Sequence, residues 1–294
     1  MKAIAAFIAI AYALAIALSL FIGLTGGVHS RFIGWAYTSM LLPAIAVWLV
    51  YLMTKEGPRI CWECFPLRYL PVALFLMPGI LHAVMLPLMA SFAGGLHWQD
   101  WLTPQPDGLY HTPALRGWGA LTTAGLISHI ALNAVAGLAI ISFLAFFEEI
   151  GWRAWLLPRL TDRMGARPAV VATAVIWALW HVPFDLSGIL HIEGVAPAKL
   201  ALMLAFGTTS AGLILGWLWL RTESIWLVSL AHGALNNWGQ YAFKYLKQSV
   251  ASDRELIVLA AGSSAVLIAG VLLLSISQNR APQRKYGKPA NGPA

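Results

Sequence analysis

Three segments of the chain place side chains with acid–base chemistry inside long apolar runs. The first is FFEEIGWRAWLLPRL, from Phe146 to Leu160, and the others are VIWALWHVPF and SLAHGALNNW. A carboxylate and an imidazole can activate a water molecule, and imidazole and amide groups can donate hydrogen bonds to developing negative charge. The residues that could do this chemistry, or support it, are Glu148, Glu149, Arg153, His181, His232 and Asn236.

Ionisable side chains are costly where an apolar run crosses a bilayer, by about 2.5–3.5 kcal/mol at the centre of a helix. Glu149 and Arg153 are four residues apart, share a helix face and are expected to pair. Glu148 points about 100° away from Glu149, and we expect the small Gly151 to leave room beside it. Glu148 is therefore an unpaired carboxylate and a candidate general base. The alternative is that all three charges lie in a loop after the fourth apolar run.

The elements that must position these residues are membrane helices. Of the 294 residues, 59% are hydrophobic and 11% are charged, whereas soluble domains carry about 25% charged residues. The net charge of +7 does not indicate nucleic-acid binding, because the basic residues lie in short segments between apolar runs. We predict an all-α, polytopic membrane helical bundle with about eight transmembrane helices. The predicted spans are approximately 3–24, 32–53, 70–95, 121–147, 168–184, 200–220, 225–244 and 256–277.

The chain is predicted to form one transmembrane domain, residues 1–278, with the site motifs at 148–238. A polar tail, residues 279–294, is predicted to be cytoplasmic and disordered. With the N-terminus inside, the inner segments hold twice as many lysines and arginines as the outer ones. The positive-inside rule then places both termini in the cytoplasm. We expect an integral protein of a bacterial or archaeal plasma membrane, in contact with membrane lipid.

Cys61 and Cys64 form a C-x-x-C motif in the predicted inner segment between the second and third spans. A structural zinc site needs four ligands, and the sequence contains no second cysteine pair. A redox interpretation needs more context than this spacing provides. We therefore expect two reduced thiols in a cytoplasmic loop.

The first two motifs are predicted to lie at one depth in the membrane. The polar segment 161–167 forms a turn, and Pro168 suits the first turn of the next helix. If the preceding helix continues to Leu160, it rises about 18 Å from Glu148 to that residue. The next helix rises about 20 Å from Pro168 to His181. The carboxylate and the imidazole should therefore face each other across an antiparallel helix pair.

The third motif is predicted to reach the same level. His232 lies about 14 Å along its helix from Glu223, which is in the loop on the same side of the membrane. Asn236 follows one turn deeper and on the same helix face. We therefore expect the side chains of Glu148, His181, His232 and Asn236 to line one polar cavity in the cytoplasmic half of the bundle.

In this order on successive membrane helices, the motifs resemble the CPBP group. This group comprises the type II CAAX prenyl proteases and their bacterial relatives, including bacteriocin-processing and self-immunity proteins. The resemblance covers residues 148–238. The sequence departs from the usual pattern at Trp177, where the family often has Phe, and at Ala154, where a Gly often follows the arginine. The shared motifs are Glu148-Glu149-x-x-x-Arg153, an aromatic residue four positions before His181, and His232-x-x-x-Asn236.

The resemblance implies an intramembrane endopeptidase of the glutamate type. Its substrate would be a peptide or protein that can carry a lipid, cleaved near the membrane in a prenylated C-terminal tail or a leader peptide. Glu148 would be the general base that activates a water molecule, helped by His181. His232 and Asn236 would stabilise the oxyanion, since a neutral imidazole and an amide can both donate a hydrogen bond.

Glu149 and Arg153 are implied to be structural supports of the first helix. We expect no cofactor, but a zinc-dependent metalloprotease stays open, with Glu148, His181 and His232 as ligands. Two other functions stay open as well. Buried ionisable residues also occur in transporters, although we find no inverted repeat. A catalytically inactive scaffold or immunity protein could keep the same fold.

Overall fold

The computed structural model describes residues 2–91, 104–110, 120–187, 195–239 and 253–276, which are almost entirely helical. These ranges contain no strand, only an isolated antiparallel bridge between Tyr110 and Leu121. The α-helices are α1 (Lys2–Leu24), α2 (Leu42–Thr54), α3 (Leu70–Ser91), α5 (Thr123–Leu132), α6 (Leu138–Glu149), α7 (Leu157–Met164), α8 (Ala166–Leu186), α9 (Pro197–Thr222), α10 (Ile225–Ala234) and α12 (Asp253–Ile276). The 3₁₀ helices are η1 (Gly27–His29), η2 (Ile33–Leu41) and η3 (Leu67–Tyr69), and the π-helices are η4 (Asn133–Gly137), η5 (Ile150–Leu156) and η6 (Leu235–Gly239).

The predicted polytopic all-α membrane bundle is confirmed. In the described ranges, seven helical segments are long and apolar enough to cross a bilayer. The eighth predicted span, 225–244, is described only as far as Gly239. The predicted tail, 279–294, lies outside the described residues. The seven segments are Lys2–Leu24, Ile33–Thr54, Leu67–Ser91, Thr123–Met164, Ala166–Leu186, Pro197–Thr222 and Leu256–Ile276.

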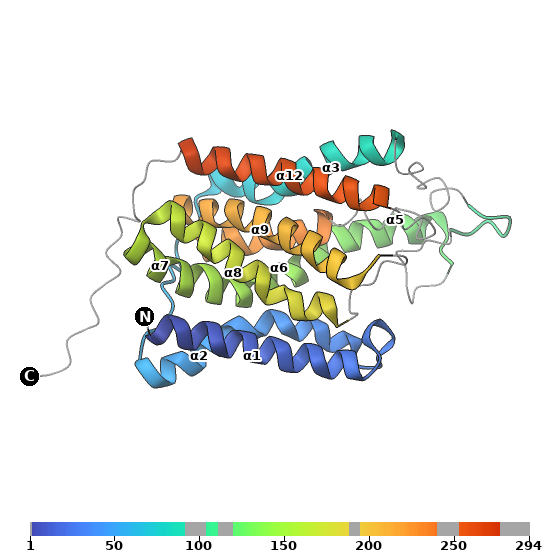
Figure 1. Cartoon of the computed structure of the whole chain (residues 1–294). Helices are drawn as coiled ribbons and strands as arrows, with labels where there is room; N and C mark the ends of the chain where they lie inside the picture. The colour runs from blue at the N-terminus through green and yellow to red at the C-terminus, as the bar shows by residue number, and fades with distance from the viewer. Residues whose placement is uncertain (1, 92–103, 111–119, 188–194, 240–252, 277–294) are drawn as a thin grey trace, which may run out of the picture.

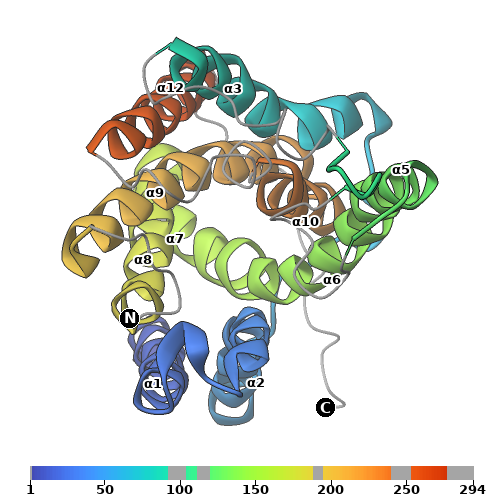
Figure 2. The same ribbon diagram turned by 90° about the vertical axis from the view of Figure 1, so that its right-hand side faces the viewer.

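The helices run side by side, with α7 and the beginning of α1 at one end of the bundle and α5 at the other (Figure 1). Viewed along the helices, α1 and α2 form one side and α3 and α12 the opposite side, with α6 to α10 between them (Figure 2). Two side-chain hydrogen bonds attach α1 to α8. Tyr12 donates to the carbonyl of Ile176 at 2.7 Å, and Trp180 donates to the carbonyl of Ala11 at 3.1 Å. The three segments with acid–base residues therefore lie on inner helices.

The first motif lies on one continuous helical rod, Thr123–Met164, that is 42 residues long and includes α5, α6 and α7. The rod continues past Leu160, as the depth prediction required. Pro158 cannot donate the α-helical hydrogen bond to the carbonyl of Ala154, because proline has no N–H. The backbone N–H of Arg59 donates to this carbonyl instead, at 2.7 Å. The chain after α2 is thus docked onto the rod five residues beyond Glu149.

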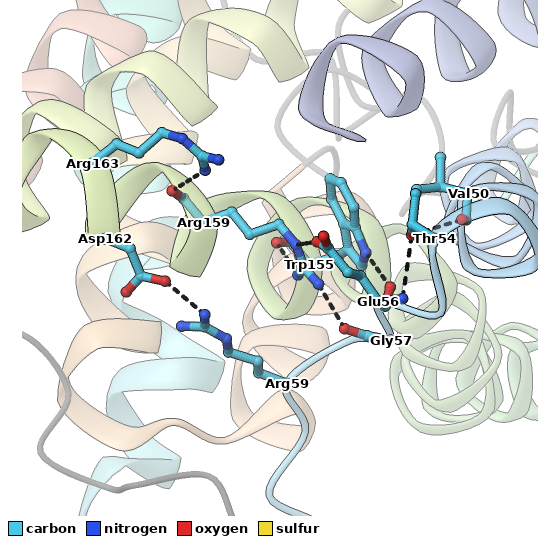
Figure 3. A network of polar contacts seen from close by, with 9 residues as sticks. All are labelled: Val50, Thr54, Glu56, Gly57, Arg59, Trp155, Arg159, Asp162 and Arg163. Atoms are coloured by element: carbon cyan, nitrogen blue, oxygen red, sulfur yellow. Dashed lines mark hydrogen bonds and ion pairs between the residues drawn. The ribbon is translucent and has the colours of Figure 1, made fainter. Parts of the chain in front are cut away.

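Side chains strengthen this docking at the α7 end of the bundle (Figure 3). The indole of Trp155 donates to the carbonyl of Glu56 at 2.9 Å. The guanidinium of Arg159 lies over the Trp155 ring at 4.1 Å and donates to the carboxylate of Glu56 at 3.1 Å. Arg59 forms an ion pair with Asp162 at 2.6 Å. The segment between α2 and α3 is therefore held against the helix that carries the first motif.

The prediction of two reduced thiols is wrong, because a disulfide joins Cys61 and Cys64. A turn in the segment between α2 and α3 brings their Cα atoms to 5.4 Å, which is within the range that disulfides require. The C-x-x-C spacing alone did not reveal this turn.

Two glycines allow helices to approach closely at the site. A Cβ at Gly233 would lie 2.0 Å from the hydroxyl of Ser142, where α10 crosses α6. A Cβ at Gly151 would lie 2.5 Å from the Cβ of Pro43 on α2. Gly151 was expected to leave room beside Glu148, but its open face is occupied by this proline. The glycine therefore serves helix packing.

Candidate active site

Glu148 lies at the end of α6 and is almost completely buried, with 3% of its surface exposed. Its Oε2 accepts a hydrogen bond from the indole Nε1 of Trp177 on α8, at 2.8 Å. The prediction that this carboxylate has no partner is therefore wrong. An indole donor is neutral, however. It orients the carboxylate without adding a charge beside it.

The predicted ion pair between Glu149 and Arg153 is present. Nη1 of Arg153 lies 2.9 Å from Oε1 of Glu149, and both side chains are completely buried. The guanidinium also lies over the ring of Trp177, 4.4 Å from its centre. Arg153 is part of the π-helix η5, which begins directly after Glu149. Local widening of an α-helix of this kind is common at functional sites.

Helix α10 brings His232 to the same carboxylate. Its Nδ1 lies 2.8 Å from Oε1 of Glu149, a contact that the sequence analysis did not predict. An ionised carboxylate only accepts hydrogen bonds, so Nδ1 is the donor in this bond. In a neutral imidazole the other nitrogen, Nε2, then has no hydrogen. In this tautomer, donation from Nε2 to an oxyanion requires the imidazolium form, and the oxyanion role of His232 stays a prediction.

His181 has a similar orientation on α8. Its Nδ1 lies 2.9 Å from the carbonyl oxygen of Trp177 and must be the donor, which leaves Nε2 able to accept a proton when the ring is neutral. The imidazole interacts electrostatically with Glu148 and His232. The Trp177 ring is edge-on to both imidazoles, with centroids 5.3 Å from His181 and 5.1 Å from His232. Trp177 thus contacts every ionisable residue of the cluster except Glu149.

A cavity of about 190 Å³ opens beside these residues. Its polar lining includes His181, His232 and Asn236, and the apolar remainder comes mainly from α9, α12 and η6. Of the described residues, Trp177 is part of the lining and Glu148 is not. The structure therefore brings the two imidazoles and the amide together around one space. The carboxylate lies one hydrogen bond behind the cavity wall.

The residues directly after Asn236 hold the third motif in place. The side chain of Asn237 donates to the carbonyl of Asn133 at 3.0 Å, and the indole of Trp238 donates to the carbonyl of Ala134 at 3.1 Å. These bonds join the π-helices η6 and η4. Of these three residues, only Asn236 is predicted from the sequence to have a role in the site. The neighbouring amide and indole were a signal that the segment NNW makes contacts to another helix.

The residues do not fit a metal site. Within the described ranges, no group of three or more His, Cys, Asp or Glu side chains is arranged to hold a metal ion. The alternative zinc set was Glu148, His181 and His232. Among the described residues, these three side chains do not form such a group.

The fold and the cluster define an integral membrane protein with a carboxylate, two imidazoles and an amide gathered inside a helical bundle. Residues 128–238 match the family model described as type II CAAX prenyl endopeptidase, Rce1-like. The matched segment includes all three motifs, and it confirms the resemblance to the CPBP group. A comparison with curated proteins found no match.

Proposed function

We propose that the protein is an intramembrane endopeptidase of the type II CAAX prenyl protease kind. It would hydrolyse a peptide bond near the membrane surface, in a prenylated C-terminal tail or a leader peptide. The observation that carries the proposal is the cavity between His181, His232 and Asn236, directly beside the buried Glu148 and inside the matched family segment. The surrounding partner is membrane lipid, and the substrate is a peptide or protein that can carry a lipid.

In the proposed reaction, Glu148 is the general base. A water molecule in the cavity would donate one hydrogen bond to Nε2 of His181, which is the free acceptor of that ring. As the water oxygen attacks the peptide carbonyl carbon, its proton passes to Glu148, which the water must reach past Trp177 because the carboxylate does not line the cavity. The Trp177 donor keeps the carboxylate oriented during this transfer. Protonated Glu148 then returns the proton to the amine that leaves when the C–N bond breaks.

The negative charge on the carbonyl oxygen would be stabilised by His232 and Asn236. Asn236 donates through its amide, and His232 donates through Nε2 as an imidazolium. Glu149 lies within hydrogen-bond distance of Nδ1 and fixes the orientation of the ring. Arg153 keeps Glu149 in position. The two residues would therefore act as positioning residues for His232.

The orientation of the protein is part of the proposal. The start of α1 and helix α7 lie at one end of the bundle (Figure 1). Arg59, Arg159 and Arg163 are grouped at the same end (Figure 3). Basic residues near the ends of membrane helices favour the cytoplasmic side. This supports a cytoplasmic location for both termini and for the segment between α2 and α3.

Glu148→Gln tests the proposal. Glutamine keeps a carbonyl that can accept the Trp177 hydrogen bond, but it cannot accept a proton from water. Cells with the wild type should show membrane-protein cleavage products, by mass spectrometry of new termini, that disappear in the variant. Glu223→Gln, in the loop between α9 and α10, is the matched control and should leave these products unchanged. Identical termini in wild-type and Glu148→Gln cells, with both proteins folded and equally abundant, would refute the proposal.

A further inference from the structure

The Cys61–Cys64 disulfide encloses an aromatic residue that contacts the site helices. The carbonyl of Trp62 accepts a hydrogen bond from the indole of Trp226 on α10, at 2.9 Å. The ring of Trp62 also lies 5.8 Å from that of Trp226 and 6.2 Å from that of Phe146 on α6. Phe146 and Trp226 are themselves stacked at 5.4 Å. The disulfide loop therefore completes a cluster of three aromatic rings.

This cluster forms part of the wall of a second cavity, of about 560 Å³, that is distinct from the one beside His181. Trp62 lines it from the disulfide loop, Phe65 from the position directly after that loop, and Phe146 and Trp226 from α6 and α10. The same two helices carry Glu148 and His232. Trp62, which the disulfide loop encloses, thus forms one wall of a cavity between the helices of the candidate site.

We propose that Cys61 and Cys64 are a thiol–disulfide exchange site whose partner is a dithiol reductant. In the oxidised form the disulfide holds Trp62 against Trp226 and Phe146. In the reduced form the loop is released and this wall of the cavity becomes mobile. The proposal goes beyond the proposed proteolysis and does not depend on it.

The exposure of the two sulfurs indicates the course of the reaction. Cys61 is buried, with 8% of its surface exposed, whereas Cys64 is partly exposed. A thiolate of the dithiol attacks Sγ of Cys64, the S–S bond breaks, and Cys61 leaves as a thiolate that takes up a proton. The second thiol of the reductant then attacks the mixed disulfide and releases Cys64. The dithiol becomes a disulfide, and two electrons and two protons have passed to the cysteine pair.

The location of the loop also fits exchange. Arg59 ties this segment to Asp162 of α7, at the end of the bundle proposed to face the cytoplasm. Cytoplasmic thiol systems keep most cysteines reduced, and disulfides found there are usually transient and regulatory or catalytic. The choice of a cytoplasmic dithiol as the partner rests on the proposed orientation of the protein in the membrane.

Thiol labelling of the full-length protein in lipid nanodiscs tests the exchange directly. The chain has two cysteines, so every label reports on this pair. In buffers of oxidised and reduced dithiothreitol, mass spectrometry after maleimide treatment should show conversion from no label to two labels in a single two-electron step. A pair that stays unlabelled in excess reduced dithiothreitol, or that is labelled in fully oxidised buffer, would overturn the proposal.

Hydrogen–deuterium exchange tests the coupling to the cavity wall. Closing even a four-residue loop restricts its open states, so amides in residues 59–66 should exchange roughly tenfold faster after reduction. The variant Cys61→Ser/Cys64→Ser should show the fast exchange in both buffers. Trp226→Phe, which removes the donor to Trp62, should speed exchange in the oxidised protein without changing the labelling. Equal exchange of the oxidised and reduced wild type would overturn the coupling.

Sealed vesicles distinguish the side of the membrane. A membrane-impermeant maleimide should label the reduced pair in inside-out vesicles and leave it unlabelled in right-side-out vesicles. The reverse pattern would overturn exchange with a cytoplasmic dithiol. None of these readouts measures cleavage, so loss of the proposed protease function and loss of the exchange site are separate outcomes.

Discussion

The buried ion pair between Glu149 and Arg153 allows a quantitative test of how the site is held together. Both side chains are completely buried. Arg153→Met removes the cation and leaves Glu149 with His232 as its remaining partner. Removal of one member of a buried pair typically costs about 3–5 kcal/mol. We expect this substitution to lower the free energy of unfolding by that amount.

An exposed ion pair in the same chain is the comparison. Arg59 and Asp162 are 2.6 Å apart, closer than the 2.9 Å of the buried pair, but their side chains are 34% and 52% exposed. Exposed pairs contribute about 0.2–1 kcal/mol. Arg59→Met should therefore cost no more than about 1 kcal/mol. An argument from distance alone would predict the opposite order.

The double variant Arg153→Met/Glu149→Gln removes both charges of the pair. It therefore tests whether the loss of stability in Arg153→Met comes from the unpaired charge of Glu149. Among the described residues, Nε and Nη2 of Arg153 and Oε2 of Glu149 have no hydrogen-bond partner. The pair therefore leaves part of its bonding capacity unused, and the main cost of breaking it is the charge left behind. The double variant should be more stable than Arg153→Met, with a coupling energy of about 2 kcal/mol.

Reversible unfolding in mixed micelles, followed by circular dichroism as the fraction of denaturing detergent rises, measures these free energies. The reasoning fails if Arg153→Met costs no more than Arg59→Met. It fails equally if the costs of Arg153→Met and Glu149→Gln add without coupling, because burial would then not determine the strength of the pair.

Three further substitutions test single contacts of the site. Trp177→Phe keeps an aromatic ring but removes the donor to Glu148, and it should lower the free energy of unfolding by about 1.5–3 kcal/mol, measured by the same method. Gly233→Ala places a methyl group 2.0 Å from the hydroxyl of Ser142 and should cost about 1–3 kcal/mol through overpacking. Asn236→Ala removes a proposed oxyanion donor and should slow the cleavage of an identified substrate by about 10²–10³-fold in a purified assay.

Matched control substitutions show whether the losses of stability are specific to the contacts of the site. Trp48→Phe changes an exposed tryptophan on α2, and a loss equal to that of Trp177→Phe would show that the donor to Glu148 contributes nothing. Gly79→Ala adds a methyl group with no atom within 4 Å, so it should be neutral or stabilising by up to about 1 kcal/mol. An equal cost for Gly79→Ala and Gly233→Ala would contradict the packing argument. Unchanged cleavage by Asn236→Ala would contradict its proposed role.

The membrane bundle and the local pairing could be predicted from the sequence. Long apolar runs become helices because a bilayer offers the backbone no other hydrogen-bond partners. The turn before Pro168 and the rise per residue placed Glu148 and His181 on facing helices. The pairing of Glu149 with Arg153 follows from their spacing on one helix. Each of these features depends on residues close together in the chain or on the solvent that surrounds it.

The contacts that shape the site were decided by the tertiary structure. Trp177 and Glu148 are 29 residues apart, and His232 and Glu149 are 83 residues apart. Whether an indole or an imidazole reaches a given carboxylate depends on how two helices cross and rotate, and this depends on side chains packed over their whole length. Helix periodicity therefore indicated which polar residues point inward. Only the packing of the helices determined which of these polar residues form hydrogen bonds with one another.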